Sequence, residues 1–390
     1  MTRREWLATI GAAGAVPLFK AAGPMLGAAW PMLGAAAPEP PTAPVAIAKC
    51  ASYDEDLTAK LGTMFDQLGG IEKLVRNKTV TIKINMTGPT SQRVQGRALG
   101  LTHYTHPKLV GATAYLLGRA GARRIRFVES AWGTGGPLED VMLDSGWNVR
   151  SLQSAAPGVE FENTNALGKG KRYATFKVPG NAYMYPAYML NHAYEETDVF
   201  VSLAKLKNHA TCGVTLSMKN CFGMTPASIY GDDAGRDEPN ENPTRGRQAV
   251  CHDGKRQPSK IAPAELHPTG SREAEYRIPH VTADLAAARP IHLAILDGVE
   301  SIAGGEGPWV RGVRIVKPGV LLAGMNPVTT DVVSTAVMGY NPRALRGTAP
   351  FQHCENTLLL AEAHGVGTTD LKRIEVRGVP IGQALYRYDS

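Results

Sequence analysis

The chain has 390 residues, of which 43% are hydrophobic and 20% are charged, and its formal net charge is +7. A chain of this length and apolar content buries a substantial core, so the composition excludes an intrinsically disordered protein. The positive excess is mild and spread along the sequence, with no basic helix face and no nucleic-acid-binding motif. Nucleic acid is therefore not an expected partner.

Residues 1–37 are predicted to form a twin-arginine signal peptide. Thr2-Arg3-Arg4-Glu5-Trp6-Leu7 resembles the twin-arginine export motif. The apolar stretch Leu7–Phe19 is too short and too rich in Gly and Ala to span a membrane. Cleavage is expected after Ala29 or Ala36, and an uncleaved anchor is the alternative. We therefore expect a periplasmic or otherwise exported protein that contacts the twin-arginine export machinery and has no stable membrane span after cleavage.

Residues 38–390 are predicted to form one α/β domain. A short strand is expected at Val45–Ala48 and an amphipathic helix at Asp54–Leu68. The run Thr105-His106-Pro107 has the cap and first-turn residues of a helix that ends before Gly121, and a strand follows at Ile125–Ser130. This helix–strand unit favours a parallel sheet with right-handed crossovers.

Polar side chains come at the ends of two of these strands. Val80–Met86 alternates apolar and polar residues, which predicts a strand with Lys83 and Asn85 on one polar face. These two side chains are candidates for binding an anion, and a solvent-facing edge is the alternative. Glu129 and Ser130 end the next strand, before a glycine run that lacks the spacing of a dinucleotide motif.

The stretch around residues 198–224 carries the strongest candidate site. The apolar run Val199–Leu203 predicts a buried strand. If the chain stays extended beyond it, three side chains at alternate positions lie on one face. These side chains are Lys205, Lys207 and His209. A helical segment follows with Lys219-Asn220 and then Gly223, a predicted C′ glycine. Open α/β sheets bind ligands at such strand ends, and a solvated basic loop is the alternative.

Residues 230–276 predict an irregular insertion, rich in Pro, Gly, Asp, Asn and Arg. We expect it to act as a lid over the strand ends. His252, His267 and His280 lie in or beside it without the spacing of a metal motif, so they are interpreted as surface histidines.

The C-terminal third returns to regular structure. A short helix is expected at Val281–Ala288, and a buried strand at Ile291–Leu296 ends at Asp297. Glu306 follows between glycines, so two carboxylates are expected near one sheet edge. They could do acid/base work or hold a divalent ion, and neutralising the lysines is the alternative.

The last predicted elements are a helix capped by Asn326, which carries Asp331, a helix near Glu355–His364, and a strand at Arg373–Val379. Five cysteines without C-x-x-C spacing allow up to two disulfides and one free thiol in an exported protein. Small buried side chains are the alternative for Cys212 and Cys221.

The run SLAKLKNHATCGVTLSMKNCFGM, Ser202–Met224, resembles the core signature of the DUF362 family, and the stretches Thr105–Val110 and Ile295–Asp331 agree with it. The resemblance covers about residues 80–378. It implies the α/β fold, the position of the site and a family aspartate at Asp331, but no settled reaction. A helix-surface or ion-pair residue is the alternative for Asp331. The ferredoxin-like cysteine clusters of some members are missing here.

Together, these patterns predict a single large α/β domain with a mostly parallel sheet flanked by helices and a ligand site at the C-terminal ends of the strands. The leading hypothesis is an exported enzyme that acts on a small anionic ligand, a carboxylate or a phosphate, by lysine anion binding and acid/base chemistry. The predicted catalytic residues are His209, Lys207, Glu306 and Asp297, and the predicted substrate-binding residues are Lys83, Asn85, Lys205, Lys219, Asn220 and Ser130.

Two rival hypotheses remain open. One is a periplasmic enzyme that depends on a metal or redox cofactor, with Glu129, His209, Asp297 and Asp331 as candidate metal ligands and Cys212 or Cys221 as further groups. The other is a non-enzymatic periplasmic binding or maturation protein that holds an anion or a metal. The sequence itself identifies no cofactor.

Overall fold

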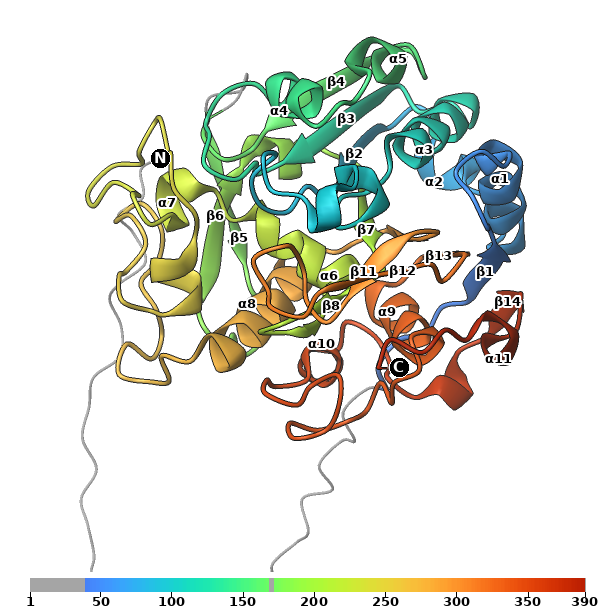
Figure 1. Ribbon diagram of the computed structural model, residues 1–390. Helices are drawn as coiled ribbons and strands as arrows, with labels where there is room; N and C mark the ends of the chain where they lie inside the picture. Colours follow the sequence, from blue (N-terminus) through green and yellow to red (C-terminus); the bar gives the residue numbers. More distant parts are fainter. Residues whose placement is uncertain (1–38, 168–171, 390) are drawn as a thin grey trace, which may run out of the picture. The chain divides into compact units, whose positions relative to one another are not determined.

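The computed structural model describes residues 39–167 and 172–389 (Figure 1). The predicted signal peptide lies outside these residues. An eight-stranded sheet has the order β14-β1-β13-β10-β7-β2-β3-β4. In that order the strands are Val376–Gly378, Val45–Lys49, Val320–Gly324, Leu293–Gly298, Val199–Lys205, Thr79–Lys83, Arg124–Glu129 and Val159–Asn163. Only β13 runs antiparallel to its neighbours, so the predicted mostly parallel sheet is confirmed.

Helices cover both faces of this sheet, and each face has its own hydrophobic core (Figure 1). One core contains α1 (Leu57–Gln67), α2 (Glu72–Val75), α3 (Pro107–Arg119), α4 (Leu138–Asp144) and α5 (Val149–Gln153). The other contains α6 (Leu216–Asn220), α7 (Ala227–Tyr230), α8 (Ala274–Ala288), α9 (Pro327–Val337), α10 (Thr357–Ala363) and α11 (Ile381–Ala384). No helix among the described residues is long and apolar enough to cross a membrane.

Three short hairpins complete the domain. They pair β5 (Tyr173–Lys177) with β6 (Ala187–Asn191), β8 (Asn208–His209) with β9 (Gly213–Val214), and β11 (Ser301–Ala303) with β12 (Arg314–Val316). The hairpin of β8 and β9 follows β7 directly, and the hairpin of β11 and β12 follows β10. Both therefore stand at the C-terminal edge of the central strands, where they can build a site.

The direction in which the chain adds strands reverses next to β2. From β2 the chain adds β3 and β4 on one side, and later adds β7 and β10 on the other side. The loops that leave the C-terminal ends of β2 and β7 diverge at such a point and leave a crevice between them. The topology therefore makes the space above β2 and β7 the candidate position for a ligand site.

Several predicted boundaries need correction. Strand β2 ends at Lys83 and is buried on both faces, because helices cover both sides of the central sheet, so the solvent-facing edge considered for this strand is wrong. Helix α8 starts at Ala274, seven residues before the predicted start, and contains Pro279. Packing of its buried residues 277–286 outweighs the lost backbone hydrogen bond at the proline.

The cysteine count allowed up to two disulfides, but the described residues contain none. All five cysteines are free and buried: Cys50, Cys212, Cys221, Cys251 and Cys354. Burial raises the pKa of the Cys221 thiol to about 12, so this group stays protonated and unreactive. The cysteines serve as small buried side chains, which is the interpretation drawn from the sequence for Cys212 and Cys221.

A buried ion pair joins the ends of β7 and β10. Asp297 lies beside Lys205 in the parallel register, and Lys205 Nζ is 3.0 Å from Asp297 Oδ2. Lys205 also donates to the Tyr53 hydroxyl at 2.9 Å and to the Gly100 carbonyl at 2.7 Å. Tyr53 and the His106 backbone N–H in turn donate to Asp297. This network fixes the loops before α1 and α3 to the sheet.

Replacement of Asp297 tests how much the domain depends on this network. Asp297→Ala leaves a buried ammonium group without its counter-ion, so we expect the free energy of unfolding to fall by about 3–5 kcal/mol. Urea titration followed by circular dichroism measures this change. Asp253→Ala, which breaks the exposed pair of Asp253 with Lys255, is the matched control and is expected to change stability little. Equal effects of the two replacements would contradict the prediction.

Candidate functional site

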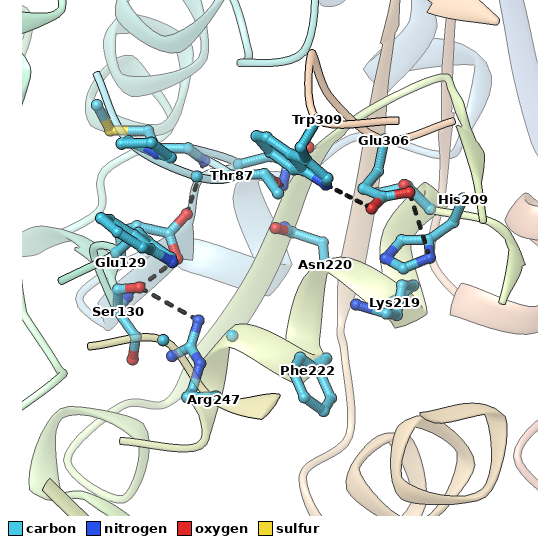
Figure 2. A pocket seen from close by; sticks show the side chains of 18 of the residues that line it. Thr87, Glu129, Ser130, His209, Lys219, Asn220, Phe222, Arg247, Glu306 and Trp309 are labelled. Atoms are coloured by element: carbon cyan, nitrogen blue, oxygen red, sulfur yellow. Dashed lines mark hydrogen bonds and ion pairs between the residues drawn. The ribbon is translucent and has the colours of Figure 1, made fainter. Parts of the chain in front are cut away.

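A cavity of about 430 Å³ opens at the C-terminal edge of β2, β3 and β7 (Figure 2). Its walls come from five segments that are far apart in the sequence. They are the loop after β2, the loop after β3, the segment from β8 to the turn after α6, the insertion, and the loop between β11 and β12. The cavity therefore lies where the strand order reverses.

An ion pair closes the floor of the cavity. Lys83 Nζ lies 2.5 Å from Glu129 Oε1, and both side chains are almost fully buried. Lys83 also donates to Asn220 Oδ1 at 3.2 Å. Glu129 accepts the backbone N–H groups of Met86 and Ser130 at 2.8 and 2.9 Å. Each of these two charges has its partners within the protein, so neither Lys83 nor Glu129 is free to pair with a charged ligand.

Gly223 makes this close pairing possible. A Cβ atom at this position would lie 3.0 Å from Lys83 Nζ and 3.2 Å from Glu129 Oε1. The residue sits inside a 3-10 turn, Cys221–Met224, and does not have a positive φ. The predicted C′ glycine is therefore wrong: the glycine is required for space beside the ion pair rather than for backbone conformation.

Two cationic side chains in the cavity have no carboxylate within ion-pair distance among the described residues, namely Lys219 and Arg247. Both lie against the Phe222 ring, with Lys219 Nζ 4.3 Å and Arg247 Cζ 5.9 Å from the ring centroid (Figure 2). Arg247 donates to two backbone carbonyls, those of Thr225 and Ser130. Burial lowers the pKa of Lys219 to about 8, so its ammonium group remains charged at neutral pH.

Two histidines line the cavity, and backbone partners fix their tautomers. His209 Nδ1 accepts the Thr211 backbone N–H at 3.2 Å, so the proton of the neutral ring is on Nε2. His252 Nδ1 lies 2.9 Å from the Arg247 carbonyl oxygen, which can only accept, so Nε2 of this ring carries a lone pair. Burial lowers the pKa of His209 well below its usual value. Burial and the charge of Lys219 lower the pKa of His252 to about 4.

Glu306 is held in its ionised form beside His209, on the side of the cavity away from Glu129 (Figure 2). It accepts from Trp309 Nε1 at 2.7 Å and from the Ala210 backbone N–H at 2.9 Å (Figure 2). Burial alone would raise the pKa of Glu306, but the hydrogen bonds from these two donors lower it. Since Ala210 directly follows His209, the hydrogen bond from its backbone N–H to Glu306 positions the histidine segment.

The structure brings most of the predicted site residues to the cavity. Those that line it are Lys83, Asn85, Glu129, Ser130, His209, Lys219, Asn220 and Glu306. Lys205 and Asp297 do not line it, because both are used in the buried network below the sheet edge. Lys207 does not line it either, since its ammonium group points to the carbonyl oxygens of His103 and Glu306 at 2.7 and 3.1 Å.

The four predicted metal ligands do not converge. Asp331 accepts the backbone N–H groups of Ser217 and Met218 at the start of α6, at 2.9 Å each, and does not line the cavity. Glu129 and Asp297 are paired with different lysines. In residues 39–167 and 172–389, no group of three or more His, Cys, Asp or Glu is placed to hold a metal ion. The metal hypothesis gains no support from this arrangement.

The insertion supplies a wall of the cavity through Asp232, Gly246, Arg247, Gln248 and His252. Its later part is anchored by a buried pair in which Glu265 and Arg277 lie 2.6 Å apart. Closure of the insertion as a lid stays a prediction.

Sequence reasoning missed Arg247 and assigned His252 to the surface. His252 instead lines the cavity and His280 is buried, so only His267 of the three is exposed. The insertion has no periodic hydrophobic pattern, so its sequence does not indicate which of its many polar residues face the cavity.

Most of this chain is similar to known proteins. The family model described as "Domain of unknown function (DUF362)" matches residues 80–336. The thylakoid-associated protein sll1697 of Synechocystis sp. (strain ATCC 27184 / PCC 6803 / Kazusa) is 28% identical over 327 residues, which cover 79% of this chain and 84% of that protein.

Two solved structures are distantly similar. A protein from Thermotoga maritima has 12% identity and a TM-score of 0.35 over 69% of this chain and 56% of its own. The lactate racemase apoprotein from Thermoanaerobacterium thermosaccharolyticum has 10% identity and a TM-score of 0.35 over 70% of this chain and 54% of its own. The chain thus spans little more than half of either protein, and neither informs the chemistry of this cavity.

Proposed function

The chain belongs to the DUF362 family, and we propose that it is an enzyme that binds a small carboxylate or phosphate in the cavity and transfers a proton on it. The observation that carries this proposal is that neither Lys219 nor Arg247 has a carboxylate within ion-pair distance among the described residues. The other buried lysines at the strand ends are paired with carboxylates or bonded to carbonyls. A bound anion would give both groups a direct partner.

His252 and His209 have different roles in the proposed proton transfer. The Nε2 lone pair of His252 can accept a proton from the ligand, whereas the Nε2–H of His209 can only donate a hydrogen bond in its neutral form. His209 would thus stabilise negative charge that develops on the ligand. Lys219 acts electrostatically on both rings, so the anion site and the proton-transfer groups are coupled. This assigns the base to His252 and makes His209 a donor.

Removal of the Lys219 charge tests the anion site. A hydrogen bond to a charged group contributes about 1.5–3 kcal/mol, so Lys219→Met should weaken phosphate or acetate binding by about 10- to 100-fold. Isothermal titration calorimetry with inorganic phosphate and with acetate measures the affinities. Lys73→Met, at an exposed lysine of α2, is the matched control. Affinities that do not differ between the two variants would overturn the anion site.

The same titration has an expected pH dependence. Lys219 must be protonated to hold an anion, and its pKa in the free protein is about 8. The wild-type affinity for acetate should therefore be constant from pH 6 to 7.5 and fall about tenfold per pH unit well above pH 8. In Lys219→Met the affinity should lose this dependence.

Deuterium exchange distinguishes an enzyme from a binding protein. We expect the wild-type chain to exchange C–H protons of one or more acids in a panel of small carboxylates and phosphates in D₂O, measured by mass spectrometry. His252→Asn keeps a donor near the Arg247 carbonyl but removes the Nε2 lone pair, so exchange should slow by about 10²- to 10⁴-fold. His267→Asn, at an exposed histidine of the same insertion, is the control. Tight binding without exchange would favour a non-enzymatic binding protein.

We infer further that the protein is exported by the twin-arginine route. The supporting observation is the motif at Arg3 and Arg4, which lies outside the described residues. The name of the Synechocystis relative places that protein at the thylakoid, which is compatible with export of this chain.

Replacement of both arginines tests the export route. Arg3→Lys with Arg4→Lys keeps the positive charge but removes the twin-arginine motif, so the unprocessed chain should accumulate in the cytoplasm. Cell fractionation and immunoblotting measure its distribution, with Lys20→Arg as a control. Unchanged export of the double variant would argue for another route.

A further inference from the structure

Two tryptophans that line the cavity are among the exposed large hydrophobic residues. Trp132 is 50% exposed and Trp309 is 43% exposed. Trp309 has a structural reason for its position: its Nε1 donates to Glu306, and its ring lies so close to Gly88 and Gly307 that neither position has room for a side chain. Burial of aromatic surface is strongly favourable, so an exposed indole at a cavity needs a separate explanation.

Trp132 has no comparable structural role. No hydrogen-bond partner of its indole is found among the described residues, and the ring contacts the insertion at Gly246. A Cβ atom at Gly246 would lie 3.1 Å from Trp132 Nε1, so the glycine lets the insertion pass close to the edge of the ring. Trp132 therefore lines the cavity with half of its surface exposed.

A second groove continues from the cavity past this ring. Its volume is about 280 Å³, and it shares Gly88, Pro89 and Trp132 with the cavity. Trp132 therefore stands at the boundary between the two spaces. A ligand that fills both must cross the Trp132 ring.

The charges of the two spaces differ. The cavity contains Lys219 and Arg247 without a carboxylate partner, whereas the lining of the groove contains no lysine or arginine. The groove instead presents Asp140 and Asp144, on successive turns of α4, and the Thr134 hydroxyl. An anionic group is thus favoured at the cavity end only, and an uncharged or hydroxyl-bearing group at the groove end.

We propose that the ligand is a ring-bearing anion, with its carboxylate or phosphate at Lys219 and Arg247, its ring stacked on Trp132, and its remainder in the groove along α4. This inference rests on the proposed anion site and specifies its substrate class. Both an aromatic ring and a sugar ring present a flat apolar face to an indole. A free inorganic anion would leave Trp132 and the groove unused.

Three phosphate monoesters test this inference: methyl phosphate, phenyl phosphate and glucose 1-phosphate. They share the anionic group, and only the last two carry a ring. Aromatic stacking corresponds to about a 2- to 10-fold gain in affinity, so at least one ring compound should bind that much more tightly than methyl phosphate to the purified full chain. Trp132→Ala should remove this gain and leave the affinity for methyl phosphate unchanged. Trp132→Phe should retain part of it.

Control measurements separate the outcomes. Tyr115→Ala, at an exposed aromatic residue of α3 outside the cavity, should keep the ring advantage. Preference for glucose 1-phosphate would identify a sugar ring, and preference for phenyl phosphate an aromatic ring. Equal binding of all three esters, or a ring advantage that persists in Trp132→Ala, would overturn the inference while the anion site stands. Failure of methyl phosphate and both ring esters to bind would overturn the anion site and the inference together.

Discussion

The compensation of buried charge at the ends of the central strands is the constraint on which the rest of the structure depends. Lysines are costly to bury unless each finds a carboxylate or several carbonyls. Lys205 finds Asp297, Lys83 finds Glu129, and Lys207 finds backbone carbonyl oxygens. These contacts join β2, β3, β7 and β10 at one edge and hold the loops above them in place.

Two cations at the candidate site have no carboxylate partner within the described part of the chain. Lys219 and Arg247 share the Phe222 ring, but no carboxylate of the described chain pairs with either. Around them, hydrogen bonds lower the pKa of Glu306, and backbone partners fix the histidine tautomers. The charges that stabilise the fold therefore lie at strand ends, on Lys83 and Lys205, whereas the charges that face the cavity lie on α6 and in the insertion.

Local sequence patterns predicted a helix or strand well where its own residues determine where it begins and ends. His106 caps α3 with Pro107 in the first turn, and Asn326 caps α9 through two backbone N–H groups, as expected. The predictions failed where distant packing decides. Helix α8 continues through Pro279 because its neighbours bury it, and Gly223 is required by the Lys83–Glu129 pair rather than by a helix end.

The sequence by itself determined the α/β class, the mostly parallel sheet and the strand ends where the site lies, because hydrophobic periodicity and caps are local signals. Only the tertiary structure decided which lysines are paired and which face the cavity. Lys205 and Lys219 look alike in sequence, yet their partners come from elements far along the chain. Arg247 and His252 joined the site for the same reason: an irregular segment acquires its position from the surfaces it packs against, and no local pattern records that position.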